Sequence, residues 1–307
     1  MLAEADSARP MRFPLLAFGT PRKLPRANEL EGRVVVLDIA FAAEGTGTSF
    51  EKVTKKLIDG LGSRLAMWVD HHDHRLHPTF RADARFVLAT KAEHGACPEM
   101  IDEALVARAG QVDTILCHGD FDGLASAAKW IRGGVEPYEG ADADARAIDT
   151  RMGTPSPRAQ VIDRALRARM HDDALKGMVV RFFATGAEDA LVFKELEGIA
   201  ESVRVMEENA RTLSKRYELR GDTAICDVRG NTLYYDKTVL LLLGQERARV
   251  ALVHDDTTIT LAARFDSGID LLALLDIQGG MPTRVSVPAS RLEDVIDRLV
   301  KAGLAKR

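Results

Sequence analysis

Histidine and aspartate gather in one short segment of the sequence, Asp70–His74 (DHHDH), which is followed closely by His77. Four of the eight histidines of the chain lie between residues 71 and 77. Imidazole nitrogens together with carboxylate oxygens are ligands that suit Mn, Fe, Zn or Ni. The segment therefore predicts a metal site, and the alternative is a polar surface loop.

A second segment, His118–Gly123 (HGDFDG), offers three more candidate ligands at alternate positions, namely His118, Asp120 and Asp122. Its two glycines permit sharp backbone geometry. A helix expected to begin near Leu124 would direct its positive N-terminal end toward an anion bound there. In the alternative, Asp122 only caps this helix, which leaves the other two polar residues unexplained.

Asp38 is the third candidate, because it follows the continuous apolar run of Arg33–Ile39 (RVVVLDI). A carboxylate at the end of a buried strand must be exposed, capped or paired, since leaving it buried alone is costly. Taken by itself, Asp38 would be a structural cap. The other two strand ends with metal-type residues make it a candidate ligand.

Strands alternating with helices position these residues. Besides Arg33–Ile39, buried strands are predicted at Leu65–Val69 and Thr114–Cys117. Helices are predicted after Ser49, whose side chain can cap the first, and from Pro98 to Gly110. This order predicts a parallel α/β sheet flanked by helices, in which ligands bind beyond the carboxyl ends of the strands.

The chain divides into three parts on this interpretation. Residues 1–187 form the metal-binding domain, whose first 31 residues are predicted to be an irregular arm. Residues 188–219 are helical and highly charged, and connect to a second, smaller α/β domain at 220–307. In that domain, strands are predicted at Arg249–His254, Thr257–Phe265 and Thr283–Val287, and a last helix at Ser290–Ala302.

Composition excludes several classes of protein. With 307 residues, a net charge of −4 and 46% hydrophobic residues, the chain is an ordinary globular protein without a global basic field. Its three cysteines have no paired spacing, which argues against a disulfide framework or a zinc ribbon. The longest apolar run, Val239–Leu243, is far too short to cross a bilayer. A cytoplasmic location is expected.

These motifs together resemble the DHH phosphoesterase family, which includes RecJ-type exonucleases, nano-RNases, cyclic-dinucleotide phosphodiesterases and family II pyrophosphatases. The signature triplet is Asp70-His71-His72, and Asp38 matches the strand-end aspartate that precedes it. The second family motif is matched by His118, Asp120, Asp122, Gly123, Ser126 and Ala127.

The resemblance implies two divalent cations, with Mn2+ the expected ion, and a role for each residue. His118 and Asp120 would bind one cation, Asp122 and His71 would bind the other, and Asp38 would bridge them. His72 would face the scissile phosphate, and Asp70 would orient the histidine pair.

The sequence departs from the family pattern in three ways. The His118 motif follows the DHH triplet instead of preceding it, so the order is permuted. The last bridging carboxylate is expected to be Asp149, ahead of Asp142 and Asp144, with a helix or turn cap as the alternative. The glycine-rich substrate segment of the family lacks its histidine here. The residues at that place are Gly279, Gly280 and Arg284, which would bind substrate phosphate unless they form an ordinary helix stop before a strand.

The predicted function is hydrolysis of a phosphoester in a nucleotide or short oligonucleotide, by a hydrolase of the phosphodiesterase or nuclease type. No long cationic track for single strands is evident. The alternatives are a phosphatase of pyrophosphate or a small phosphorylated metabolite, and a non-catalytic nucleotide-binding regulatory protein on the same fold. A homodimer is left open, and no membrane partner is expected.

Overall fold

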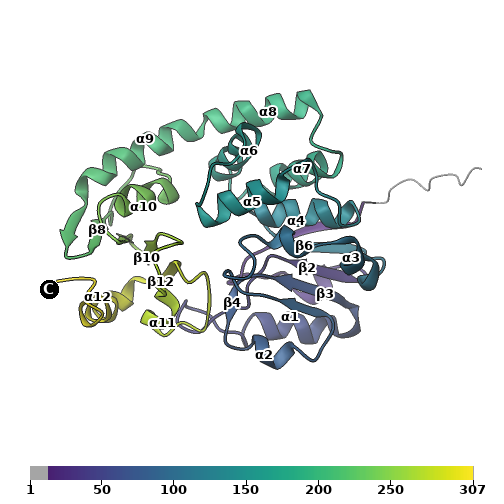
Figure 1. The fold of residues 1–307 in the computed structure, drawn as a ribbon, viewed down its shortest axis with the longest axis horizontal. Coiled ribbons are helices and arrows are strands. Elements are labelled where there is room, and N and C mark those ends of the chain that lie inside the picture. The colour runs from purple at the N-terminus through teal and green to yellow at the C-terminus, as the bar shows by residue number, and fades with distance from the viewer. Residues whose placement is uncertain (1–12, 307) are drawn as a thin grey trace, which may run out of the picture.

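A computed structural model describes residues 13–306, and these form two sheet-containing domains (Figure 1). The first contains a five-stranded sheet in the order β1-β6-β2-β3-β5, in which every pairing is parallel. Its strands are β1 (Leu15–Gly19), β2 (Val34–Leu37), β3 (Leu65–Asp70), β5 (Phe86–Leu88) and β6 (Thr114–His118). The predicted parallel α/β sheet is confirmed.

Register explains how three separate strand ends come together. Leu37, the last residue of β2, pairs with Val69 of β3 on one side and with Cys117 of β6 on the other. The residues that follow these three partners are Asp38, Asp70 and His118. The candidate ligands therefore start from adjacent positions on the carboxyl edge of the sheet.

Helices cover both faces of this sheet, which is why its central strands are apolar at every position. One face packs Val35, Met67 and Ile115 against α3 (Glu103–Ala109), α4 (Phe121–Ile131), α6 (Pro157–Ala168), α7 (Asp173–Ala184) and α8 (Ala190–Glu201). The other packs Val36 and Trp68 against α1 (Thr54–Leu61) and the aromatic residues around Phe41. Two more helices, α2 (His77–Phe80) and α5 (Ala141–Thr150), complete the domain.

The prediction of an irregular arm over residues 1–31 is wrong for the part that the structure describes, because β1 runs from Leu15 to Gly19 and pairs with β6. This strand lies at the edge of the sheet with Leu15 half exposed, and its apolar run Leu15–Phe18 is short and lies within a Pro- and Arg-rich segment. Residues 1–12 of the predicted arm lie outside the described residues.

Helix starts also differ from their predicted positions. Pro98 opens only the short 3-10 turn Cys97–Met100, and α3 begins at Glu103, where the Asp102 side chain accepts a hydrogen bond from the Leu105 N–H at 2.7 Å. Helix α4 begins at Phe121 instead of near Leu124. Helix α1 begins at Thr54, later than the predicted cap at Ser49. Short turns precede α1 and α3 and delay their starts, whereas α4 starts directly after Asp120.

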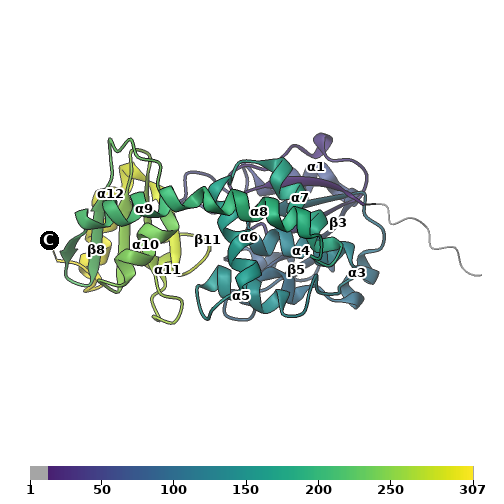
Figure 2. The same cartoon turned by 90° about the horizontal axis from the view of Figure 1, so that it is seen from above.

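Helices α8 and α9 (Val203–Leu213) run across from the first domain to the second, as both views show (Figures 1 and 2). The second sheet is mixed, in the order β12-β10-β9-β8-β7. Its strands are β7 (Glu218–Arg220), β8 (Thr223–Asp227), β9 (Val250–His254), β10 (Thr258–Ala263) and β12 (Arg284–Pro288). Its helices are α10 (Lys237–Gln245), α11 (Leu271–Leu275) and α12 (Leu292–Lys301). A smaller second α/β domain is confirmed, while the predicted boundaries at residues 187 and 219 stay predictions.

A two-stranded ribbon joins the domains directly. Strand β4 (Asp73–His74), which follows the DHH triplet, pairs antiparallel with β11 (Gly279–Gly280) of the second domain. A Cβ atom on Gly279 would stand 2.2 Å from the His74 ring and 2.5 Å from the Asp73 carbonyl oxygen. This close approach requires glycine. No helix among the described residues is long and apolar enough to cross a membrane.

Candidate metal centre

Asp38 stands at the centre of the candidate site and is held in an unusual backbone conformation. Its φ angle is 58°, in the left-handed region that non-glycine residues rarely adopt. The Asp38 N–H donates to the Val69 carbonyl oxygen at 2.9 Å, which fixes the turn out of β2. The side chain is 2% exposed, and neither carboxylate oxygen has a hydrogen-bond partner.

An outer donor group consists of Asp38, His118 and Asp120, whose ligand atoms all lie within 4.8 Å of one another. His118 Nδ1 lies 2.8 Å from Asp120 Oδ2 and 3.8 Å from Asp38 Oδ2. Oδ1 of Asp120 is also buried without a partner. Buried carboxylate oxygens without partners are costly, so this group has the chemistry of a hard cation site. The residues fit a divalent metal.

An inner donor group consists of His71, Asp122 and Asp149, again within 4.8 Å. His71 Nε2 lies 3.3 Å from Asp122 Oδ2 and 3.7 Å from Asp149 Oδ2. The same nitrogen lies 3.1 Å from Asp38 Oδ1, so Asp38 contacts both groups. The structure therefore brings together all six residues expected to ligate metal, although the roles of these residues remain predictions.

The carboxylates and histidines of the site shift one another's pKa values. Burial and the neighbouring Asp122 carboxylate raise the pKa of Asp38 well above its usual value. In the outer group, burial also disfavours the ionised forms of His118 and Asp120. Their mutual contact outweighs it, so the pKa of His118 rises to about 10 and the pKa of Asp120 falls to about 2. Such groups accept a cation readily because it removes the repulsion between them.

His71 is oriented by a backbone carbonyl. Its Nδ1 lies 2.9 Å from the carbonyl oxygen of His94, so Nδ1 carries the proton that is donated there. Nε2 faces the carboxylates of Asp38 and Asp122, and although burial opposes it, these contacts raise the pKa of His71 to about 11. The carbonyl belongs to the turn Thr90–His94, which is closed by the Glu93 carboxylate accepting from the Thr90 N–H and hydroxyl, both at 2.8 Å.

Lys91 of the same turn was not predicted as a site residue. Its side chain is 2% exposed, and its Nζ lies 2.9 Å from His71 Nε2 and in a very short contact with Asp149 Oδ2. Although burial opposes it, the carboxylates of Asp149, Asp122 and Asp38 raise the pKa of the Lys91 ammonium. No sequence signal marks Lys91, because it is a single lysine in a loop twenty positions after His71.

His72 faces a different way from His71. Its Nδ1 lies 2.7 Å from Asp70 Oδ1, and the ring lines the large cavity between the domains. Asp70 itself is fully buried, so it orients His72 from inside the protein. Since Nδ1 is engaged, Nε2 is the nitrogen left to contact a bound molecule.

Of the three carboxylates weighed for the last position, only Asp149 reaches the site. It lies near the C-terminal end of α5 rather than at a cap position. Asp142 pairs with Lys129 at 2.5 Å, and Asp144 accepts from Tyr138 and Ser156 at 2.9 and 2.6 Å. These partners lie away from both donor groups.

A cavity of about 1660 Å³ opens in front of the site, between the two domains. His118, Asp120, Asp122 and Asp149 line it from one side, and Arg284 lines it from the second domain. Other cationic residues along its walls are Lys23, Arg26, Arg151, Arg167, Lys176 and Arg264. Gly279 and Gly280 are not among the described residues that line this cavity, since their backbone pairs with Asp73–His74.

Arg284 is a free cation on that wall. Its guanidinium hydrogen-bonds only to the Thr238 hydroxyl, at 3.3 Å, and forms no ion pair with a carboxylate of the described residues. Burial lowers the pKa of Arg284 from its usual value. An arginine held without a partner beside a cavity is suited to bind a phosphate.

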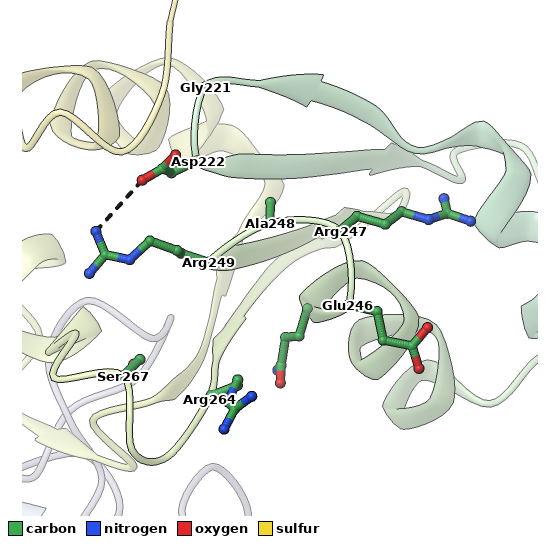
Figure 3. Close-up of a pocket in the computed structure, with 9 residues that line it drawn as sticks. Gly221, Asp222, Glu246, Arg247, Ala248, Arg249, Arg264 and Ser267 are labelled. Carbon is green, nitrogen blue, oxygen red and sulfur yellow. Dashed lines mark ion pairs between the residues drawn. The ribbon is translucent and has the colours of Figure 1, made fainter.

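A second pocket lies in the second domain between Asp222, Arg249 and Arg264 (Figure 3). Arg249 already pairs with Asp222 at 3.6 Å, and Arg264 pairs with Asp266 at 2.8 Å. No group of three or more metal-type side chains found among residues 13–306 lies here. This pocket therefore lacks the chemistry of the first.

Known proteins resemble this chain in structure but not in sequence. No protein-family model matches it, and no curated protein sequence does. One similar solved structure is the exonuclease RecJ bound to manganese, with 12% identity and a TM-score of 0.45, over 94% of this chain and 90% of that one.

Another is the pGpG-specific phosphodiesterase PggH from Vibrio cholerae, with 13% identity and a TM-score of 0.34, over 51% of this chain. The match spans only 64% of that phosphodiesterase. Likeness at this level does not specify a substrate. A phosphodiesterase and a RecJ exonuclease are thus among the structural neighbours of this chain, and they are of the kinds that its DHH-type motifs resemble.

Proposed function

We propose that this chain is a metal-dependent phosphoesterase that hydrolyses a phosphodiester in a dinucleotide or short oligonucleotide. One observation carries the proposal. Buried carboxylate oxygens of the outer donor group have no partners, and the group opens into a cavity whose opposite wall presents Arg284. A cation-binding site and an anion-binding wall that face each other across one cavity match a phosphoester substrate.

The outer group, Asp38, His118 and Asp120, is proposed to hold the divalent ion, with Mn2+ expected. When bound, such an ion supplies a water of lowered pKa and neutralises charge on the phosphate. Arg284 binds a neighbouring phosphate and holds the substrate in register. His72, oriented by Asp70, presents Nε2 to the scissile phosphate, where it would accept the proton that the attacking water loses.

Cavity size favours the oligonucleotide over the alternatives. Typical small-molecule pockets enclose about 300–1,000 Å³, and this cavity is larger. Pyrophosphate or a small phosphorylated metabolite would leave most of it filled with water. Lys23 of the first domain and Arg284 of the second line it without an ion pair to a carboxylate of the described residues, which suits a ligand with more than one phosphate.

A substrate panel tests the proposal. Purified protein is incubated with bis(p-nitrophenyl) phosphate, mononucleotides, linear and cyclic dinucleotides, short RNA and pyrophosphate, with Mn2+ or with EDTA. Mn2+-dependent cleavage of dinucleotides or short RNA is expected. Cleavage of pyrophosphate alone would support the phosphatase alternative, and tight nucleotide binding by a protein that binds no metal would support the regulatory one.

A further inference from the structure

The two donor groups differ in one respect that the DHH resemblance does not anticipate, which is a lysine inside one of them. The Lys91 ammonium contacts two of the three inner residues, His71 and Asp149. In the outer group, both Asp38 oxygens and Asp120 Oδ1 lack hydrogen-bond partners. A lysine side chain thus contacts the inner group, whereas in the outer group Asp120 is paired with His118, which is itself an expected ligand.

The nitrogen His71 Nε2 decides what the inner group can bind. Because Nδ1 donates to the His94 carbonyl oxygen, Nε2 is the ring nitrogen left to ligate a metal ion. Lys91 Nζ lies 2.9 Å from that nitrogen and contacts Asp149 Oδ2, so it stands where a metal ion would have to bind. A divalent cation and an ammonium at one ring nitrogen would also repel each other strongly in a buried site.

The position of Lys91 is built into the fold. Its backbone N–H donates to Asp73 Oδ2 at 3.2 Å, and its turn also carries the carbonyl that orients His71. The side chain is not among the described residues that line the cavity, so it reaches the inner group from the protein side. A buried lysine is stable only when it is paired, and here its pairs are the ligands themselves.

We propose that the Lys91 ammonium takes the place of a cation in the inner donor group, so that the chain binds one divalent ion, in the outer group. This inference rests on the proposed function and replaces the two cations that the resemblance implies. The ammonium holds the inner carboxylates together while it leaves Asp38 free for the outer ion. Lys91 is thus a positioning residue that supplies fixed positive charge.

Counting ions tests this proposal without relying on activity. Wild-type protein and Lys91→Ala are loaded with Mn2+ and desalted, and bound manganese per chain is measured by elemental mass spectrometry. One ion is expected in the wild type and two in Lys91→Ala, with the spin-coupled electron paramagnetic resonance signal of neighbouring Mn2+ ions in the variant only. Lys129→Ala is the matched control, because Lys129 is a buried lysine that pairs with Asp142 outside both groups. It should bind one ion.

The number of bound ions in each variant separates the possible outcomes. Two ions in the wild type would overturn the role of Lys91 but leave the proposed function standing. No ion in the wild type would overturn both. One ion in Lys91→Ala would show that the inner group is no cation site, which overturns the replacement.

A substitution at another residue keeps the proposal testable if Lys91→Ala fails to fold. His118→Ala should lose the single ion, because His118 belongs to the outer group. Retention of that ion in His118→Ala would place it in the inner group, against the proposal.

Discussion

The outer and inner donor groups start from the same sheet edge and share Asp38 as a neighbour, yet they differ in access and in charge. The side chains of His118 and Asp120 are 30% and 48% exposed to the cavity, whereas His71 is fully buried. Lys91 lies only in the buried group. The comparison teaches that two similar ligand sets on one sheet edge can differ in their surroundings, because a nearby loop places a lysine side chain against only one of them.

The largest effect is expected for Asp38→Asn, which weakens the carboxylate that both groups contact. Loss of the charge should reduce Mn2+-dependent hydrolysis of bis(p-nitrophenyl) phosphate by about 1,000-fold, or about 4 kcal/mol in transition-state stabilisation. The measurement is initial rate at saturating Mn2+, with circular dichroism to verify folding. Asp83→Asn, which alters an ion pair with Arg85 outside the donor groups, serves as the control. Activity above a tenth of wild type would remove Asp38 from the site.

A smaller loss is expected for Asp70→Asn, which removes the charge that orients His72. Partners of this kind are worth about 10- to 100-fold in activity. Because neither donor group contains Asp70, bound manganese should stay at the wild-type value. The rate constant and the manganese content are measured on the same preparation. A parallel loss of manganese would assign Asp70 to the metal site instead.

Arg284→Met tests the wall that faces the outer group. The KM for a dinucleotide should rise about tenfold, equivalent to about 1.4 kcal/mol, because a phosphate contact is lost. Turnover of bis(p-nitrophenyl) phosphate should change less than about twofold, since that substrate has no second phosphate. Arg249→Met, in the pocket of Figure 3, is the matched control and should affect neither substrate. Equal losses on both substrates would argue against substrate binding by Arg284.

The smallest effect is expected for Glu93→Ala, which opens the turn that carries Lys91 and the His94 carbonyl. Loss of its two hydrogen bonds should lower the free energy of unfolding by about 1 kcal/mol. The Kd for Mn2+ should stay within about twofold of wild type, because the ion binds in the outer group. Urea unfolding and isothermal titration calorimetry measure the two quantities. A large change in Mn2+ affinity would make the inner group the one that holds the ion.

Much of the centre could be predicted because its ligand types are rare and cluster at strand ends. The apolar runs before Asp38, Asp70 and His118 predicted buried parallel strands, and parallel strands bring their carboxyl ends to one edge. The sequence placed Asp149 ahead of Asp142 and Asp144 by the resemblance alone, and only the fold shows which of these carboxylates turns toward the site.

Other features of the structure were not predicted from the sequence. Lys91 is an isolated lysine whose importance arises only from burial against His71, a tertiary property. Strand β1 has the apolar run Leu15–Phe18, but this run is short and lies within a Pro- and Arg-rich segment that indicated an irregular arm. The ribbon of β4 and β11 is two residues long on each side, and its pairing joins positions about two hundred residues apart.

That ribbon has a mechanical consequence. Its first residue, Asp73, follows His72 directly. Arg75, just after the ribbon, forms an ion pair with Asp276 of the second domain at 2.6 Å. A swing of the second domain would therefore pull on the backbone next to the histidine proposed to face the substrate. Any widening of the cleft to admit a ligand would act on the backbone beside this imidazole.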